Sequence, residues 1–452
     1  MRLARNGEFA QEIISSENRF VTISSCSSAQ LRWTPEVLFS MVHSSDLARS
    51  AFNFMRICIF SDSFYPYISG VSIAILQQAN ALAARGHEVS IVRPRPARKE
   101  AAESIPDLDP TIQIFDTPVT IPHRAFARLR LACPTFFSTW RKLRTVNPDV
   151  IHVHTEFGTG WEGLAMARVR KVPLLGTFHT FFAEPEYLKH FPVPNCRLTR
   201  GVLWRYSVGF FNRCHTVITP SRAVHDSLAG RGAKCRLEKV SNGIRRPKLQ
   251  TEESIRERRR EMDLEGVTFL YVGRVSHEKS IELVLEAFGQ VWSINPSVRL
   301  LVIGGGPHEK ELRQMAVKMP CAAAIQFTGA IPNHQLLSEN LYRLGDVFVT
   351  ASTTENQPVS ILEAMSFGLP LIGPRAKGLP EMILDDQNGR LVEPKDVKSL
   401  AQAMTQAAED HEARERWAQG AISMAQEHDL DRVAGRLEDL YQDAITSRRV
   451  PV

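Results

Sequence analysis

Short apolar runs alternate with amphipathic stretches from Met55 onward. The first series of runs comprises RICIFS, EVSIVRP, DVIHVHT, PLLGTFHT and TVITPS, and the stretch from Val71 to Arg85 that follows the first run ends at Gly86. Short β-rich runs separated by stretches of helical period indicate βαβ units. The pattern therefore predicts a parallel sheet.

A second series of the same kind begins near Val267. Its runs are VTFLYVGRVS, VRLLVIGGG, IQFTGAI, DVFVTAS and PLIGPR, and helices are expected at residues 280–288, from 309, at 335–342 and at 359–366. This alternation predicts a second doubly wound sheet. The polar stretch VSNGIRRPKLQTEES between the two series contains Asn-Gly and Pro, which is typical of a linker.

These patterns divide the chain into four expected segments. Residues 1–54 are Ser-rich and aperiodic, which predicts a disordered extension, and the abrupt change at Met55 leaves open whether they belong to the mature protein. Residues 55–240 and 241–425 are expected to form two Rossmann-like domains. Residues 426–452 are expected to form a helix that packs back on the first of them.

Composition narrows the class of protein. The chain has 452 residues, enough for two cores, and its net charge of +6 favours anionic partners without choosing among nucleic acid, lipid and phosphorylated ligands. Seven cysteines at irregular spacing indicate reduced thiols in a cytoplasm, and no metal-ligand spacing is seen. No apolar window reaches the roughly twenty residues that a membrane-spanning helix needs.

Polar residues and glycines follow the predicted strands. Two open parallel sheets that face each other predict a cleft lined by these loops. The residues concerned are Asp62, Gly70, His154, Glu156, His179, Arg274, Lys279, Gly304 to Gly306 and Glu355. Arg274 and Lys279 could stabilise a departing phosphate in place of a metal ion, although solvated surface charges are the commoner state of such residues.

The other loops allow two interpretations each. Gly70 could let a diphosphate approach the first amides of a helix, and Gly305 in VIGGGP could let a ligand approach the backbone, but both could also form ordinary turns. His179 could bond a substrate hydroxyl or transfer a proton, or it could be structural.

The stretch TTENQPVSILEAMSFGLP places two glutamates around a predicted helix start. Pro358 suits the first helical position, so Glu355 precedes the helix and Glu363 lies inside it. Amides at this start would favour an anion, while the carboxylates could accept bonds from sugar hydroxyls. The alternative makes Glu355 a capping residue and Glu363 a solvated one.

Taken in order, Gly70, GTFHT, SNGI, FLYVGRVSHEK, LLVIGGGP, IQFTGAI and TTENQPVSILEAMSFGLPLI resemble the retaining GT-B glycosyltransferases of family 4 type that share an E-x7-E motif. The similarity extends from Met55 to about Asp429. It implies two facing Rossmann-like domains with a cleft between them, an acceptor bound mainly by the first domain, and a nucleotide-diphosphate-sugar donor held mainly by the second. No cofactor and no metal are implied.

The resemblance also implies roles for single residues. Arg274 and Lys279 would hold the donor diphosphate, Glu363 the ribose and Glu355 the donor sugar. The backbone amides of Asn356, Gln357, Pro358 and Val359 would be expected around that sugar, except that Pro358 has no N–H. Gly70 and Gly305 would lie at the donor, and His179 beside the transferred sugar. Family members often carry Gly-Phe or Gly-Leu after the first glutamate, so Asn356-Gln357-Pro358 leaves the donor open among UDP-glucose, UDP-galactose, UDP-glucuronate and GDP-mannose.

The acceptor side resembles that of diacylglycerol and related lipid glycosyltransferases over residues 152–191. Upstream, residues 123–144 interleave basic and aromatic side chains, among them Arg124, Phe126, Arg141, Arg144 and Trp140. Such a segment could lie on anionic lipid, or it could be a helix packed under the sheet. We expect a hexosyltransferase acting on a membrane lipid, diacylglycerol in the first place, peripherally on the inner face of the cytoplasmic membrane.

Three other classes of function compete with this one. A mannosyl- or glucosyltransferase acting on a soluble or polyprenyl-linked saccharide keeps the same donor chemistry. A nucleic-acid-binding module lacks a recognisable fold signature, so no nucleic-acid partner is expected. A dinucleotide oxidoreductase would need a GxGxxG loop that the chain does not have.

Overall fold

The computed structural model describes residues 54–123, 128–179, 181, 184–188 and 194–447. The predicted extension before Phe54 lies outside these residues. So do Arg124 and Phe126 of the basic-aromatic segment, and parts of the segment 152–191. Within the described part of the chain, no helix combines the length and apolar character needed to cross a membrane.

The first sheet has seven parallel strands. Their spatial order is β3 (Gln113–Thr117), β2 (Glu88–Pro94), β1 (Arg56–Phe60), β6 (Val150–Val153), β7 (Leu174–Thr177), β8 (Thr216–Thr219) and β9 (Arg236–Lys239). The apolar runs of the sequence form the inner strands, which are buried on both faces as parallel strands require. The structure thus confirms the first predicted sheet.

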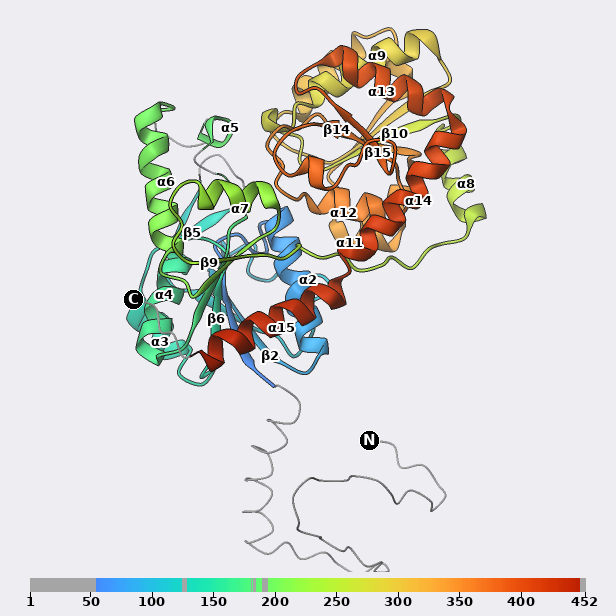
Figure 1. The fold of residues 1–452 in the computed structure, drawn as a ribbon. Coiled ribbons are helices and arrows are strands. Elements are labelled where there is room, and N and C mark those ends of the chain that lie inside the picture. Colours follow the sequence, from blue (N-terminus) through green and yellow to red (C-terminus); the bar gives the residue numbers. More distant parts are fainter. Residues whose placement is uncertain (1–53, 124–127, 180, 182–183, 189–193, 448–452) are drawn as a thin grey trace, which may run out of the picture. The chain divides into compact units, whose positions relative to one another are not determined.

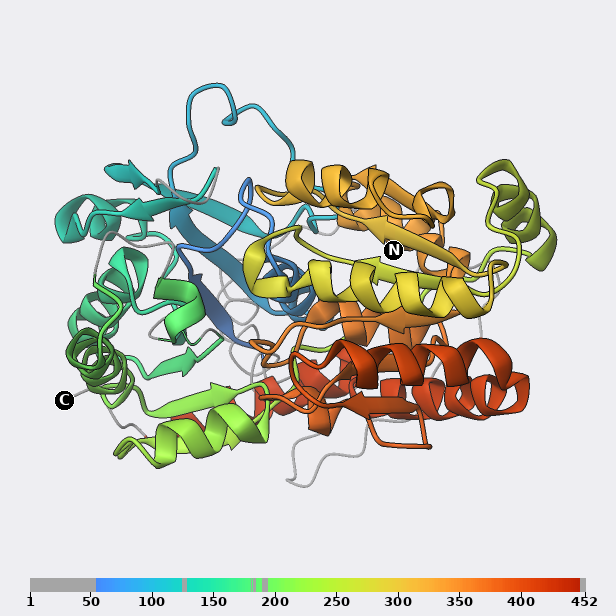
Figure 2. The same ribbon diagram turned by 90° about the horizontal axis from the view of Figure 1, so that it is seen from above.

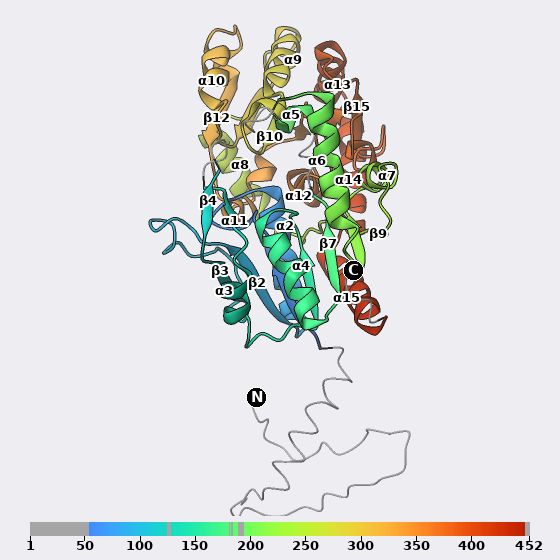
Figure 3. The same ribbon diagram turned by 90° about the vertical axis from the view of Figure 1, so that its left-hand side faces the viewer.

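Helices and one hairpin accompany this sheet. They are α2 (Gly70–Ala84), α3 (Phe136–Lys142), α4 (Gly158–Arg170), α5 (Pro185–Leu188), α6 (Arg197–Phe211), α7 (Arg222–Ala229) and the antiparallel pair β4 (Thr120–Pro122) and β5 (Arg130–Ala132). Figure 3 shows α4 lying along the sheet, where it contacts β6, and α3 lies beside α4 and also contacts β3.

The second sheet has six parallel strands. Their order is β12 (Ile325–Gly329), β11 (Arg299–Ile303), β10 (Thr268–Val272), β13 (Val347–Val349), β14 (Leu371–Pro374) and β15 (Gly389–Val392). β10, at the centre, pairs with β11 and β13 and is buried throughout. The second predicted sheet is confirmed as well.

We call the first sheet with its helices the first half of the molecule, and the second sheet with its helices the second half. The helices of the second half are α8 (Glu252–Glu261), α9 (Ile281–Ile294), α10 (Glu309–Val317), α11 (Asn333–Ser338), α12 (Val359–Ser366), α13 (Val397–Glu409) and α14 (His411–Glu427). Its short 3-10 turns are η1 (His277–Lys279), η2 (Ala322–Ala324), η3 (Leu341–Leu344) and η4 (Leu379–Glu381). Figure 2 shows α9, in yellow, beside the red helix α13. The single helix predicted over 335–342 is wrong, because Asn340 adopts a left-handed conformation that separates α11 from η3.

The last helix, α15 (Leu430–Thr446), packs on the first sheet although it follows the second in the chain. It lies against α2 (Figure 1). Its residues Leu437, Leu440 and Tyr441 belong to the same buried cluster as Ile57 and Ile59 of β1. Where the chain returns, Ile244 N–H donates to His428 O at 2.8 Å, and Leu430 N–H donates to Ile244 O at 3.0 Å. The two segments that connect the sheets therefore lie side by side.

Candidate active site

Lys279 and Glu355 form an ion pair within the second half. Lys279 closes the short turn η1 after β10, and Glu355 follows β13, the strand next to β10. The Nζ atom of Lys279 donates to Oε1 of Glu355, and the two side chains are only 19% and 14% exposed. The interpretation of Lys279 as a solvated surface charge is therefore wrong.

Arg274 contacts the first half of the molecule. Its Nη2 donates to the hydroxyl of Tyr67 at 2.6 Å, and its guanidinium lies 5.3 Å from the centre of the Tyr67 ring. Tyr67 belongs to the loop between β1 and α2, directly before the helix that Gly70 begins. Since Arg274 and Lys279 both come from the loop after β10, their charges gather at one end of the second sheet.

Glu363 is buried inside α12. It is 2% exposed; Asn333 Nδ2 donates to its Oε1 at 2.7 Å and the Tyr342 hydroxyl donates to its Oε2 at 2.5 Å. Burial raises the pKa of this carboxyl to about 7. The alternative that made Glu363 a solvated helix residue is wrong. Each carboxylate oxygen can accept a second hydrogen bond, so capacity for further hydroxyl donors remains.

The loop before α12 joins the two halves. Asn356 Nδ2 donates to the backbone oxygen of His179 at 2.6 Å, while Gln357 Oε1 accepts from Asn242 N–H at 2.7 Å. A Cβ placed on Gly70 would lie 3.8 Å from Cγ2 of Val359, so Gly70 lies beside the start of α12. This helix spans Val359–Ser366, as its pattern predicted, but Pro358 is the N-cap residue and not the first helical residue, and no side chain caps the helix.

The glycine loop after β11 is shaped by backbone packing. A Cβ on Gly304 would lie 1.8 Å from the backbone oxygen of Gly273, and one on Gly306 would lie 2.1 Å from that of Val275. Gly305 is less restricted, since its Cβ would meet Ala330 Cβ at 3.0 Å. The glycines at 304 and 306 are thus explained by the close approach of the loop after β10.

The imidazole rings of His152, His154 and His179 lie close together at the ends of β6 and β7 of the first sheet. The rings of His154 and His179 stack at 5.2 Å and share a 2.9 Å hydrogen bond, and His152 lies 4.2 Å from His154. His152 also shares hydrogen bonds with the hydroxyls of Tyr441 and Thr177. Burial lowers the pKa of His179 to about 4 and that of His152 to about 3, so both rings are neutral at neutral pH.

Asp62 and Glu156 are the two other acidic residues that the sequence analysis placed after strands. Asp62 is a structural residue: its carboxylate accepts from Ala132 N–H at 2.8 Å, from Thr159 Oγ1 at 2.6 Å and from Thr155 Oγ1 at 2.9 Å. Glu156 is buried, and burial raises its pKa to about 7.

Several residues that contact the candidate active site were not predicted from the sequence. Tyr67, Asn242, Asn333 and Tyr342 each bond a candidate residue or its loop. Asn242 stands in the motif SNGI, which offered a signal, whereas no pattern in the sequence distinguishes Tyr67 or Tyr342. The described residues also include a group with metal-ligand chemistry, namely His277, His308 and Glu311.

Comparison with known proteins identifies the class. The fold resembles that of Anabaena HepE in complex with UDP-glucose, with a TM-score of 0.67 at 18% identity over 86% of this chain and 99% of that one. It also resembles sucrose-phosphate synthase from Thermosynechococcus elongatus, with a TM-score of 0.69 at 18% identity over 86% and 99% of the two chains. Together with the two parallel sheets, these likenesses establish the GT-B fold.

Sequence relatives identify the family. Residues 68–246 match the model described as Glycosyltransferase Family 4, and residues 253–424 match Glycosyl transferases group 1. The alpha-monoglucosyldiacylglycerol synthase of Streptococcus pneumoniae is 31% identical over 346 residues, 75% of each chain. A GDP-mannose-dependent alpha-mannosyltransferase of Corynebacterium glutamicum is 26% identical over 405 residues, 88% of this chain and 91% of that protein. The chain therefore belongs to the family 4 glycosyltransferases, as its motifs indicated.

Proposed function

We propose that this protein is a retaining hexosyltransferase that moves a sugar from a nucleotide diphosphate to diacylglycerol. The observation that carries the proposal is the gathering of Arg274, Lys279 and Glu355 beside residues of the first half, through the contacts to Tyr67 and His179. Cations and a carboxylate in one place suit a donor that is anionic at its phosphates and hydroxylated at its sugar.

The second half holds the donor in this proposal. Arg274 and Lys279 bind the diphosphate, and the uncapped start of α12 adds the backbone amides at Asn356, Gln357 and Val359, since a helix start attracts anions. Glu363 accepts ribose hydroxyls with its remaining hydrogen-bonding capacity. Gly70 and Gly305 lie next to the donor and leave room for it. Glu355, in contact with Lys279, accepts hydroxyls of the sugar.

The transfer exchanges one bond at the anomeric carbon. The bond from this carbon to the phosphate oxygen breaks, and the acceptor hydroxyl oxygen bonds to the carbon on the same face. The hydroxyl proton passes to the departing phosphate, whose charge Arg274 and Lys279 stabilise without a metal. His179, neutral at neutral pH, bonds a hydroxyl of the transferred sugar.

Apolar side chains exposed on the first half support a lipid acceptor. Along α6, Leu198 and Val202 are 77% and 57% exposed and alternate with the exposed Arg197 and Arg205. Between α3 and α4 lies an apolar pocket of about 300 Å³ that Phe136 and Trp140 help to line, with Arg141 and Arg144 exposed nearby. Basic and apolar side chains presented together suit the surface of an anionic membrane. We propose peripheral binding at the inner face of the cytoplasmic membrane.

A labelled-donor assay tests the proposal. The full-length protein is incubated with radiolabelled UDP-glucose and detergent-dispersed diacylglycerol, and the chloroform phase is counted. We expect a labelled lipid whose anomeric configuration, determined by NMR, matches that of the donor. Absence of chloroform-soluble label with UDP-glucose, UDP-galactose, UDP-glucuronate and GDP-mannose would reject the lipid acceptor, and an inverted product would reject retention.

A second candidate is a mannosyltransferase acting on a soluble or polyprenyl-linked saccharide. The similarity to a GDP-mannose-dependent mannosyltransferase over 88% of the chain favours it. Donor-induced thermal stabilisation separates the two: UDP-glucose should raise the melting temperature most under the first proposal, and GDP-mannose under the second.

A further inference from the structure

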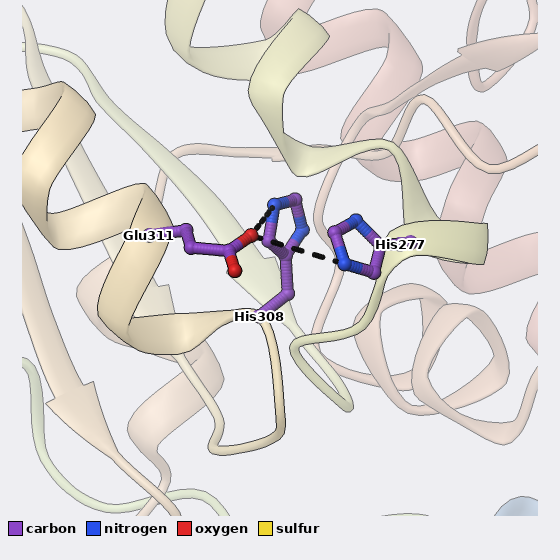
Figure 4. A group of neighbouring side chains, drawn as sticks. All are labelled: His277, His308 and Glu311. Carbon is purple, nitrogen blue, oxygen red and sulfur yellow. Dashed lines mark ion pairs between the residues drawn. The ribbon is translucent and has the colours of Figure 1, made fainter.

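His277, His308 and Glu311 bring three ligating atoms within 4.8 Å of one another (Figure 4). His277 begins η1, after β10, and His308 precedes α10, into whose first turn Glu311 falls. The Nε2 atoms of the two histidines lie 3.8 and 3.2 Å from Oε2 of Glu311. None of these residues has a part in the proposed transfer.

Two of the three separations are close to those around a bound transition metal. Tetrahedral Zn²⁺ with bonds of 2.0–2.1 Å holds its ligand atoms about 3.3 Å apart. The two measured separations lie on either side of this value, and His277 and Glu311, whose side chains are 62% and 63% exposed, can adjust. Two imidazoles and one carboxylate suit Zn²⁺ or its first-row neighbours, whereas Mg²⁺ and Ca²⁺ prefer oxygen alone.

The other ring nitrogen of His308 supplies an independent observation. His308 is 8% exposed, and its Nδ1 is buried without a hydrogen-bond partner. The nearest carboxylate oxygen is Oε2 of Glu282, at 3.9 Å, which is also buried and without a hydrogen-bond partner. A metal-bound histidine typically donates its second N–H to a carboxylate. Binding through Nε2 would therefore direct Nδ1–H of His308 to Glu282.

We propose that His277, His308 and Glu311 bind Zn²⁺, with Glu282 orienting His308 and the fourth position open to water. No metal-ligand spacing is visible along the sequence, because the ligands come from two separate loops.

The ion would connect the loop after β10 to the loop after β11. These loops already exchange backbone hydrogen bonds, from Val275 N–H to Gly305 O at 3.0 Å and from His308 N–H to Val275 O at 3.1 Å. Bound Zn²⁺ would tie them together through side chains and stabilise the folded protein. Zinc binding does not depend on the proposed transferase activity and can be tested without it.

Calorimetric titration of the EDTA-treated, full-length protein with ZnCl2 tests the site. We expect one saturable equivalent, no heat of binding with MgCl2, and a tetrahedral visible spectrum with Co²⁺. His277→Ala, His308→Ala and Glu311→Gln should each weaken Zn²⁺ binding by about tenfold or more, since even loss of an outer-shell partner costs roughly that much. Because His277 is exposed, His277→Ala should keep the metal-free melting temperature while losing the rise that Zn²⁺ causes in the wild type.

His411→Ala is the matched control. His411 and Glu415 form an exposed His–Glu pair on α14, with Nδ1 and Oε1 3.8 Å apart, but they are not part of a group of three such ligands among the described residues. This variant should bind Zn²⁺ like the wild type. The proposal is overturned if the wild type shows no saturable binding, if the three cluster variants keep its affinity, or if His411→Ala loses as much as they do.

Discussion

The two halves of the molecule bring polar groups of opposite kinds to the candidate site. The second half contributes charges in contact, Lys279 with Glu355, whereas the first contributes stacked imidazoles that burial keeps neutral. A fixed charge stabilises a departing phosphate, while a neutral imidazole can bond a hydroxyl without repelling nearby cations. In the proposed transfer, leaving-group stabilisation therefore falls to the second half and sugar positioning to the first.

Removing the charge of Lys279 should have the largest effect. We expect Lys279→Ala to lower kcat by roughly a hundred- to a thousandfold, the range for loss of one preorganised stabilising group. Steady-state kinetics with the labelled donor measures it. Lys239→Ala is the control, because Lys239 also pairs with a glutamate of the second half, Glu381 at 2.9 Å, outside the site. If the two variants had the same kcat, the second half could not be assigned the stabilisation of the departing phosphate.

The neutral imidazoles should make the fold sensitive to acid. The unfolded chain binds protons below a pKa of about 6.5, whereas His179 and His152 bind them only near 4 and 3 in the folded state. The free energy of unfolding should therefore fall as pH falls from 6.5 toward 4, by about 1.4 kcal/mol per pH unit for each excluded proton.

Urea unfolding at pH 7, 6 and 5 measures this slope. His179→Gln should flatten it by up to one proton relative to the wild type. Glu363 acts oppositely, since its raised pKa of about 7 makes its contribution to stability decline as pH rises from 4.5 to 7. The comparison is therefore made between variants and not from the wild type alone. An unchanged slope in His179→Gln would mean that this imidazole is charged in the folded protein.

A substitution of Glu363 tests whether the second half binds the donor. Glu363→Gln keeps the shape of the buried side chain but removes its charge, so the donor KM should rise about tenfold, the value of a hydrogen bond to a charged group, with kcat little changed. Glu339→Gln is the control; this half-buried carboxylate of the same half pairs with Arg258 at 2.5 Å. A normal donor KM in Glu363→Gln would contradict the ribose contact.

The smallest expected effect concerns the membrane. Leu198→Glu on α6 should weaken binding to anionic vesicles about fivefold, given about 1 kcal/mol per charge near such a surface. Val317→Glu at the end of α10 in the second half is equally exposed, at 77%, and should leave vesicle binding unchanged. Sedimentation with phosphatidylglycerol vesicles measures both variants. Equal losses would indicate that the two halves do not differ in their approach to lipid.

The sequence predicted the inner strands of both sheets but not all the edges. Apolar runs such as RICIF and TFLYV identify β1 and β10, which are buried on both faces. The edge strand β9 reads RLEK, with no apolar run, because an edge strand has one neighbour and one side open to water. Its place in the sheet is decided by pairing with β8, which no local pattern reveals.

The candidate site was predictable where the chemistry is local. Arg274, Lys279 and Glu355 follow strands, and a parallel sheet brings such positions together. The contact of Arg274 with Tyr67 and that of Glu363 with Tyr342 depend on tertiary packing between distant segments, so periodicity could not supply them. The roles of the site residues in transfer stay predictions.

The position of α15 has a consequence for synthesis. The core around β1 needs Leu437, Leu440 and Tyr441, which the ribosome adds only after the entire second half. At about 5–20 residues per second, the nascent first sheet waits on the order of ten seconds or more for its last helix. During that interval, Ile57 and Ile59 lack part of their buried surroundings, so a nascent chain stalled before Leu430 should be an early target for chaperones.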